Sequence, residues 1–150
     1  MADLDEIDDR ILRSLTADGR ISNVALADRV GLSPSACLRR VQDLERIGVI
    51  KGYRAVLDPA QTGRSFLAYL AVGLSVHSKA GQESFERAMA LAPEVKECHN
   101  IAGAFEYLLR VEAEDLPSYK RFHTDKLGAL PEVASMTTYV VMGSPKDERG

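Results

Sequence analysis

The sequence predicts an α+β protein of two domains. Three short helical patterns, each opened by a residue that can cap a helix, occupy residues 5–46 of the 150. From residue 66 onward, apolar runs alternate with amphipathic ones in the order strand, helix, strand, strand, helix, strand. A polar, turn-rich stretch separates the two parts, so we place the first domain at residues 1–60, a hinge at 61–65 and the second domain at 66–150.

Polar caps and a glycine mark the ends of the first two helices. Asp5 can cap a helix that runs to Ala17, and the acidic residues after it suit the positive end of the helix dipole. Ser22 can cap a second, shorter helix, which ends at Gly31. The face of this second helix that we expect to be buried consists of Val24, Leu26, Ala27 and Val30.

The third helix has the features of a DNA-recognition helix. Ser33 can cap it, and Pro34 takes the first position, where the missing N–H costs nothing. Leu38, Val41 and Leu44 recur at helical spacing and are expected to pack inward, which leaves small residues and arginines outside. Two helices joined by a tight glycine turn, the second with such an outer face, are typical of a helix-turn-helix.

This outer face predicts the DNA contacts. Small side chains near the start of the helix allow close entry into the major groove, and Arg39 and Arg40 can reach guanine edges or phosphates. We expect one arginine to read bases and the other to hold phosphate. An ion pair with Asp43 is the alternative for Arg39. The predicted DNA-contacting residues are Arg20, Asn23, Ser33, Ser35, Ala36, Arg39, Arg40 and Lys51.

The net charge of −3 conceals an uneven distribution along the chain. Residues 1–18 contain six acidic residues and two arginines, whereas residues 19–54 contain seven basic and three acidic residues. Phosphate binding requires a locally basic surface rather than a basic protein, because fields are screened over about a Debye length. Ordinary solvated helix faces are the alternative explanation.

Beyond Gly48, two short β-rich runs at residues 49–50 and 53–57 flank Lys51 and predict the wing of a winged helix.

Several stretches of the first domain follow one another in a recognisable order and spacing. They are Leu4-Asp5, Asp18-Gly19-Arg20-Ile21-Ser22-Asn23, Leu26-Ala27, Val30-Gly31-Leu32-Ser33-Pro34-Ser35, Cys37-Leu38-Arg39-Arg40-Val41, Gly48-Val49-Ile50 and Leu57-Asp58-Pro59. In this order and spacing they resemble the Lrp/AsnC family of leucine- and asparagine-responsive regulators. The resemblance implies a bacterial or archaeal transcription regulator whose partner is double-stranded operator DNA.

The second domain is predicted to be ferredoxin-like. Strand-like runs cover residues 66–76, 95–102, 105–111 and 133–142, and amphipathic helices cover residues 81–91 and 116–127. This βαββαβ order is typical of one sheet with its helices on one face. It also resembles the small regulatory domain of the Lrp/AsnC family.

A candidate effector site lies in the turn at residues 102–107. Gly103 allows a tight turn that leaves amide groups uncovered for a carboxylate, and Glu106 can hold an ammonium group, so together they suit an amino acid. A plain hairpin turn is the alternative. The family resemblance favours the site, because members bind small effectors at a Gly-x-x-Asp-Tyr turn, where this chain has Glu106 as the acid. The turn residues are Ala102, Gly103, Ala104, Phe105, Glu106 and Tyr107.

The resemblance also implies assembly. Family members form dimers that assemble further, commonly to octamers, and the last strand of a neighbouring subunit contributes to the site. In this chain Thr137 and Thr138 are the matching hydroxyl donors, with simple β-propensity as the alternative. The apolar strands lack a partner within so small a domain, and dimerisation of sheet on sheet would bury them.

Other classes of function have little support in the sequence. No nucleophile–base pair, zinc spacing or phosphate loop occurs, so we expect no enzyme, no metal and no cofactor beyond an amino-acid effector. Cys98 and His99 are adjacent in a predicted strand and should point to opposite faces, and Cys37 should be a core residue. His77 and His123 have no evident partner.

Two further classes have little support. An RNA-binding sheet of the same topology would need paired aromatics in its central strands, and the run at residues 105–111 lacks the basic-glycine-aromatic signature of such a sheet. The intact pair of Arg39 and Arg40 argues against an effector module that has lost DNA binding. No run reaches the roughly 18 apolar residues of a membrane span, and neither a secretory signal nor a CxxC pattern occurs. We therefore expect a cytoplasmic location.

Overall fold

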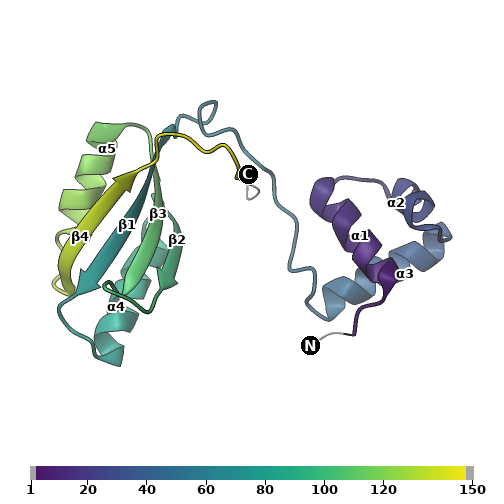
Figure 1. Ribbon diagram of the computed structural model, residues 1–150, viewed down its shortest axis with the longest axis horizontal. Coiled ribbons are helices and arrows are strands. Elements are labelled where there is room, and N and C mark those ends of the chain that lie inside the picture. Colours follow the sequence, from purple (N-terminus) through teal and green to yellow (C-terminus); the bar gives the residue numbers. More distant parts are fainter. Residues whose placement is uncertain (1–2, 148–150) are drawn as a thin grey trace. The chain divides into compact units, whose positions relative to one another are not determined.

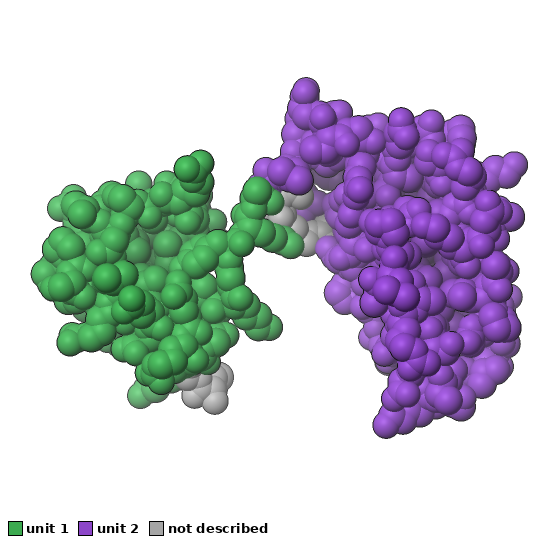
Figure 2. All heavy atoms as spheres, turned by 180° about the vertical axis from the view of Figure 1, so that it is seen from behind, with its two compact units in different colours: residues 1–55 green, residues 56–150 purple. Residues whose placement is uncertain are grey.

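The computed structural model describes residues 3–147, which form two compact units that meet between Ala55 and Val56 in the sequence (Figure 2). Among the described residues, no helix combines the length and the apolar character that crossing a bilayer requires.

The first unit consists of three helices, α1 (Glu6–Ala17), α2 (Asn23–Val30) and α3 (Pro34–Arg46) (Figure 1). All three predicted N-caps are confirmed. Asp5 and Asp8 form a reciprocal capping box at α1, with N–O distances of 2.9 and 3.2 Å. Ser22 caps α2, and Gly31 ends that helix with a φ of 73°, which an L-residue with a side chain rarely adopts.

The core of the first unit differs in two places from the predicted one. Its buried members are Ile11, Leu26, Ala27, Val30, Cys37 and Leu44, none more than 3 % exposed. The prediction that Val24 and Leu38 are buried is wrong, because they are 66 % and 46 % exposed. Cys37 lies on the inward face of α3 in place of Leu38, and the prediction that Cys37 is a core residue is confirmed.

The two predicted wing strands are not formed. Residues 47–65 contain no strand, although Val49 and Ile50 pack against the first core. The segment at residues 51–57 is exposed, and strands need a partner to pair their backbone groups. No strand within residues 3–147 pairs with this segment. Asp58 then begins a hydrogen-bonded turn, accepting from the N–H of Ala60 at 2.8 Å.

The second unit confirms the predicted βαββαβ order. Its elements are β1 (Phe66–Leu74), α4 (Lys79–Leu91), β2 (Val95–Asn100), β3 (Tyr107–Ala113), α5 (Leu116–Arg121), η1 (Phe122–Leu127) and β4 (Val133–Val140). The sheet order is β2-β3-β1-β4, with every neighbouring pair antiparallel. Both helices lie on the same face of this sheet (Figure 1). The second predicted helix changes at Phe122 from an α-helix to the π-helical turn η1.

Strand alternation divides the sheet into a helix-covered face and an open face. The covered face supplies the main core, including Leu70, Val72, Leu109 and Val111, each of which is fully buried. The open face includes Tyr139, which is paired with Tyr69 and is 54 % exposed. The two faces therefore present different side chains to any ligand or partner.

Candidate functional site

The turn between α2 and α3 is held by two of the residues predicted to contact DNA. Asn23 donates from Nδ2 to the carbonyl oxygen of Pro34 at 2.8 Å, which ties the start of α2 to the start of α3. Ser33 Oγ accepts from the N–H of Ala36 at 3.3 Å and is 3.3 Å from the hydroxyl of Ser35. Asn23 and Ser33 therefore shape the helix-turn-helix whether or not they also touch DNA.

The outer face of α3 consists of Ser35, Leu38, Arg39 and Gln42, all exposed and spaced as neighbours on one helical face. Arg39 forms no ion pair within residues 3–147. The expected alternative partner, Asp43, is instead 3.0 Å from the guanidinium of Arg46. Arg39 is thus available to a nucleic acid. Leu38 and Gln42 were not among the predicted contacts, although their helical spacing from Ser35 and Arg39 was a usable signal.

Arg40 lies on the flank of α3 that faces α1. Its Nη1 is 2.6 Å from Asp5 Oδ2 and 3.0 Å from Asp8 Oδ1, and its side chain is 32 % exposed. The N–H of Asp8 and then Arg40 lower the pKa of the Asp5 carboxyl, and the two carboxylates raise the pKa of Arg40. A role for Arg40 in DNA binding stays a prediction, but in the free protein its charge is already matched by two acids.

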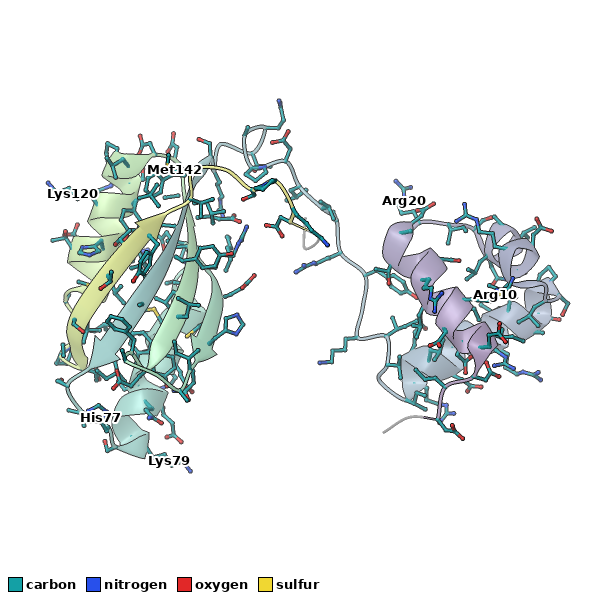
Figure 3. All side chains as sticks on the ribbon, viewed as in Figure 1. Arg10, Arg20, His77, Lys79, Lys120 and Met142 are labelled. Carbon is teal, nitrogen blue, oxygen red and sulfur yellow. The ribbon has the colours of Figure 1, made fainter. Side chains whose placement is uncertain are left out.

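The remaining predicted DNA contacts are accessible to different degrees. Arg20 and Lys51 are exposed, and Ala36 is half-buried beside the core. Figure 3 shows Arg20 beyond the end of α1 with its side chain pointing away from the helices. These positions suit contacts to a phosphate backbone more than to base edges.

The turn between β2 and β3 presents a row of unpaired amides. The N–H of Ile101 donates to Glu106 O at 2.8 Å, and the N–H of Glu106 donates to Val72 O at 3.1 Å, so both ends are anchored. Between these anchors, the amides of residues 102–105 donate no hydrogen bond within residues 3–147. Gly103 lies in open space without a positive φ, so this backbone does not itself require glycine there. Glycine would matter for a ligand that approaches closely.

The side chain of Glu106 folds back onto the end of β1. Its Oε2 accepts from the N–H of Leu74 at 2.8 Å, and its Oε1 is 3.2 Å from Nδ1 of His77. The Glu106 side chain is 25 % exposed, whereas that of His77 is 69 % exposed. Figure 3 shows His77 at the end of the sheet where α4 begins, near Lys79. One carboxylate thus holds the strand end, and each of its oxygens keeps a lone pair for a ligand.

Gly73 and Ser135 complete this end of the sheet, and neither was among the predicted site residues. They are paired across β1 and β4, where the register shifts after Gly73. A Cβ at position 73 would collide with the hydroxyl of Ser135 and would lie 3.6 Å from Glu106 Oε2. Glycine therefore lets the carboxylate and the hydroxyl approach the same point of the backbone. A glycine inside a strand run was the available signal.

The last predicted effector residues lie in three different places. Tyr107 is 1 % exposed and donates to Glu86 Oε1 at 2.6 Å, and burial followed by the Glu86 carboxylate raises its pKa to about 12. Thr138 is 2.5 Å from the hydroxyl of Tyr119, on the helix-covered face. Thr137 is half-buried on the open face, paired with Ala71. Within one chain, neither threonine lies at the turn.

Side chains alternate between the two faces along β2, so Cys98 and His99 lie on opposite faces of the sheet. Cys98 pairs with Leu109 on the helix-covered side, and His99 pairs with Leu108 on the open side, as predicted. Across residues 3–147, no group of three or more His, Cys, Asp or Glu side chains is arranged to hold a metal ion.

Comparisons with known proteins agree with this two-part arrangement. Residues 4–51 match the family model described as a winged helix-turn-helix DNA-binding domain, and residues 67–150 match the Lrp/AsnC ligand-binding domain. The leucine-responsive regulatory protein of Escherichia coli is 44 % identical over 144 residues, covering 96 % of this chain and 88 % of that protein. The proline dehydrogenase transcriptional activator of Rhizobium radiobacter is 43 % identical over 145 residues, covering 97 % and 93 %.

Solved structures show the same fold. A transcriptional regulator from Neisseria meningitidis, crystallised with L-methionine, superposes with a TM-score of 0.93 at 33 % identity, covering 97 % of this chain and 94 % of that one. A feast or famine regulatory protein from Mycobacterium tuberculosis, also complexed with L-methionine, gives 0.86 at 28 % identity, covering 99 % and 98 %. The chain is therefore a DNA-binding transcription regulator and belongs to the Lrp/AsnC family.

Proposed function

We propose that this protein binds double-stranded operator DNA through α3 and that an amino acid bound at the turn of residues 102–106 modulates the binding. The observation that carries the effector proposal is that unpaired amides at residues 102–105 are followed directly by Glu106, whose carboxylate still has room for a donor. The amides provide donors for an α-carboxylate, and Glu106 provides an acceptor for an α-ammonium group.

The DNA half of the proposal rests on the outer face of α3. Arg39 is exposed and lacks an ion pair within the described chain, and Ser35 is small enough for close approach to a groove. In a homodimer, two such helices would read an inverted repeat whose half-sites lie about one helical turn apart, or a multiple of it. Arg20 and Lys51 would hold phosphates on either side of the base contacts.

The L-methionine found in two relatives supports an amino acid as the class of effector. The acid at the site is Glu106, whose side chain is one methylene longer than that of the aspartate in the family's turn. Its carboxylate already accepts a hydrogen bond from the Leu74 amide. An amino acid would share this carboxylate with Leu74 and His77 rather than find it unoccupied. An effector that differs in affinity for two states of the protein would shift the population between them.

Assembly follows from the open face of the sheet. Tyr69 and Tyr139 pair there without cover from the helices, and a second copy packed on this face would bury them. We place Thr137 at such an interface and propose a homodimer that assembles further, to an octamer.

We propose the same domain boundaries as the sequence predicts, with the DNA-binding domain at residues 1–60, a hinge at 61–65 and the effector-binding domain at 66–150. We propose a cytoplasmic location, because the proposed partner is operator DNA, and the proposal includes no catalytic step.

Thermal-shift measurements with each of the twenty amino acids test the effector site. A ligand at about 100 times its Kd stabilises the protein by about 2.7 kcal/mol, so a true effector gives a clear shift. Gly103→Asp places a carboxylate beside the free amides and should abolish the shift. The matched control is Gly143→Asp, at another open glycine of the same unit, which should retain it. A Gly103→Asp protein that still responds would place the effector elsewhere.

A further inference from the structure

Polarity alone would predict that Leu38 packs inward and that Arg40 points to solvent, but the structure shows the opposite arrangement. Leu38 is 46 % exposed on the outer face of α3, whereas Arg40 turns toward α1 and bonds to two aspartates. Successive residues of a helix are about 100° apart, so buried Cys37 and Leu44, with Arg40 on the flank toward α1, leave Leu38 on the outward side of α3. Departures from local rules of this kind concentrate at functional sites.

Leu38 is the one large apolar side chain among the exposed residues of this face, where its neighbours are Ser35, Arg39 and Gln42. It lies four residues after Pro34, roughly 6 Å along the helix from its start, the part that enters a major groove. The floor of that groove offers hydrogen-bonding groups on every base and one apolar group, the C5-methyl of thymine. Ser35, Arg39 and Gln42 can pair with the hydrogen-bonding groups, but Leu38 cannot.

We propose that Leu38 is a specificity-determining residue that recognises the methyl group of a thymine in each operator half-site. The inference rests on the proposed binding of operator DNA through α3. The burial of Cys37 and Leu44 sets the rotation of α3 that presents Leu38, and the ion pairs of Arg40 with Asp5 and Asp8 add to it.

Uracil in place of thymine tests the contact, because the two bases differ only by this methyl group. Duplexes would be selected from a randomised pool by the wild-type protein, and each thymine of the selected site would then be replaced by uracil. Burying one methyl group contributes about 0.8 kcal/mol, so the contacted thymine should lose about fourfold in affinity per half-site. Leu38→Ala should bind thymine and uracil duplexes equally well, whereas Leu38→Met should keep the difference.

Ile47→Ala is the matched control. Ile47 is 49 % exposed and follows the last residue of the same helix, about 13 Å along the axis from Leu38. This variant should retain the full uracil penalty. The inference is overturned if no uracil replacement weakens the wild type, or if Leu38→Ala keeps the penalty. A wild-type protein that selects no sequence at all refutes the proposed function instead, so the two failures can be told apart.

Discussion

Replacing Glu106 separates the structural from the ligand-binding role of its carboxylate. Leu74 is 4 % exposed, and its N–H donates to Glu106 Oε2 at 2.8 Å. Glu106→Ala leaves that donor without an acceptor, which costs about 1–3 kcal/mol. The contact with His77 adds little, because the His77 side chain is 69 % exposed. Glu106→Gln keeps an oxygen at the same reach and should cost less than about 1 kcal/mol.

Urea unfolding followed by circular dichroism, without effector, measures this difference. In a thermal melt of a unit the size of residues 56–150, the same loss of about 2 kcal/mol would lower the Tm by about 8–16 °C. Both variants lose the negative charge that would hold an ammonium group, so neither should respond to the effector. Glu106→Gln is therefore expected to be stable and unresponsive. If Glu106→Ala unfolds at the wild-type urea concentration, the bond to Leu74 does not support the strand end as argued.

Three further predictions concern the first unit. Arg39→Ala should weaken operator binding by about 1–3 kcal/mol and reduce its salt dependence, measured by gel shift at several salt concentrations, and an unchanged affinity would remove Arg39 from the interface. The lowered pKa of Asp5 means that its ionised form stabilises the fold above the ordinary carboxyl pKa of about 4. That stability should be lost as pH falls through the lowered value, and acid titration of Asp5→Asn by circular dichroism should show a weaker loss. Asn23→Ala removes the bond to Pro34 O and should cost about 0.5–1.5 kcal/mol in unfolding free energy, whereas an unchanged value would show that the turn holds without it.

Local signals in the sequence were sufficient for the element order and for the helix ends. Ser22, Ser33 and Asp5 cap the helices as predicted, because a cap depends on a few adjacent residues. The alternation of apolar residues likewise placed the four strands and made the opposite faces of Cys98 and His99 predictable. Interactions within a few residues of chain determine all of these features.

Features that depend on distant partners were the ones missed. Arg40 turns inward because two acids lie more than thirty residues earlier, and helical spacing alone carries no information about that pairing. The wing strands require a partner strand, and none of the strands among the described residues pairs with them. At the effector site, the turn and its acid were predictable, but the return of Glu106 to Leu74 and the approach of Ser135 to Gly73 arise only from the sheet order.

The unpaired amides of residues 102–105 have a consequence for hydrogen exchange. Backbone N–H groups without an acceptor exchange quickly with solvent, whereas the Leu74 N–H is protected by Glu106 in the absence of ligand. Capture of a carboxylate by the turn would slow exchange at residues 102–105, and an ammonium group that shares the Glu106 carboxylate would weaken its bond to the Leu74 N–H and speed exchange at Leu74. Deuterium uptake at these two places would therefore report separately on the two ends of a bound zwitterion.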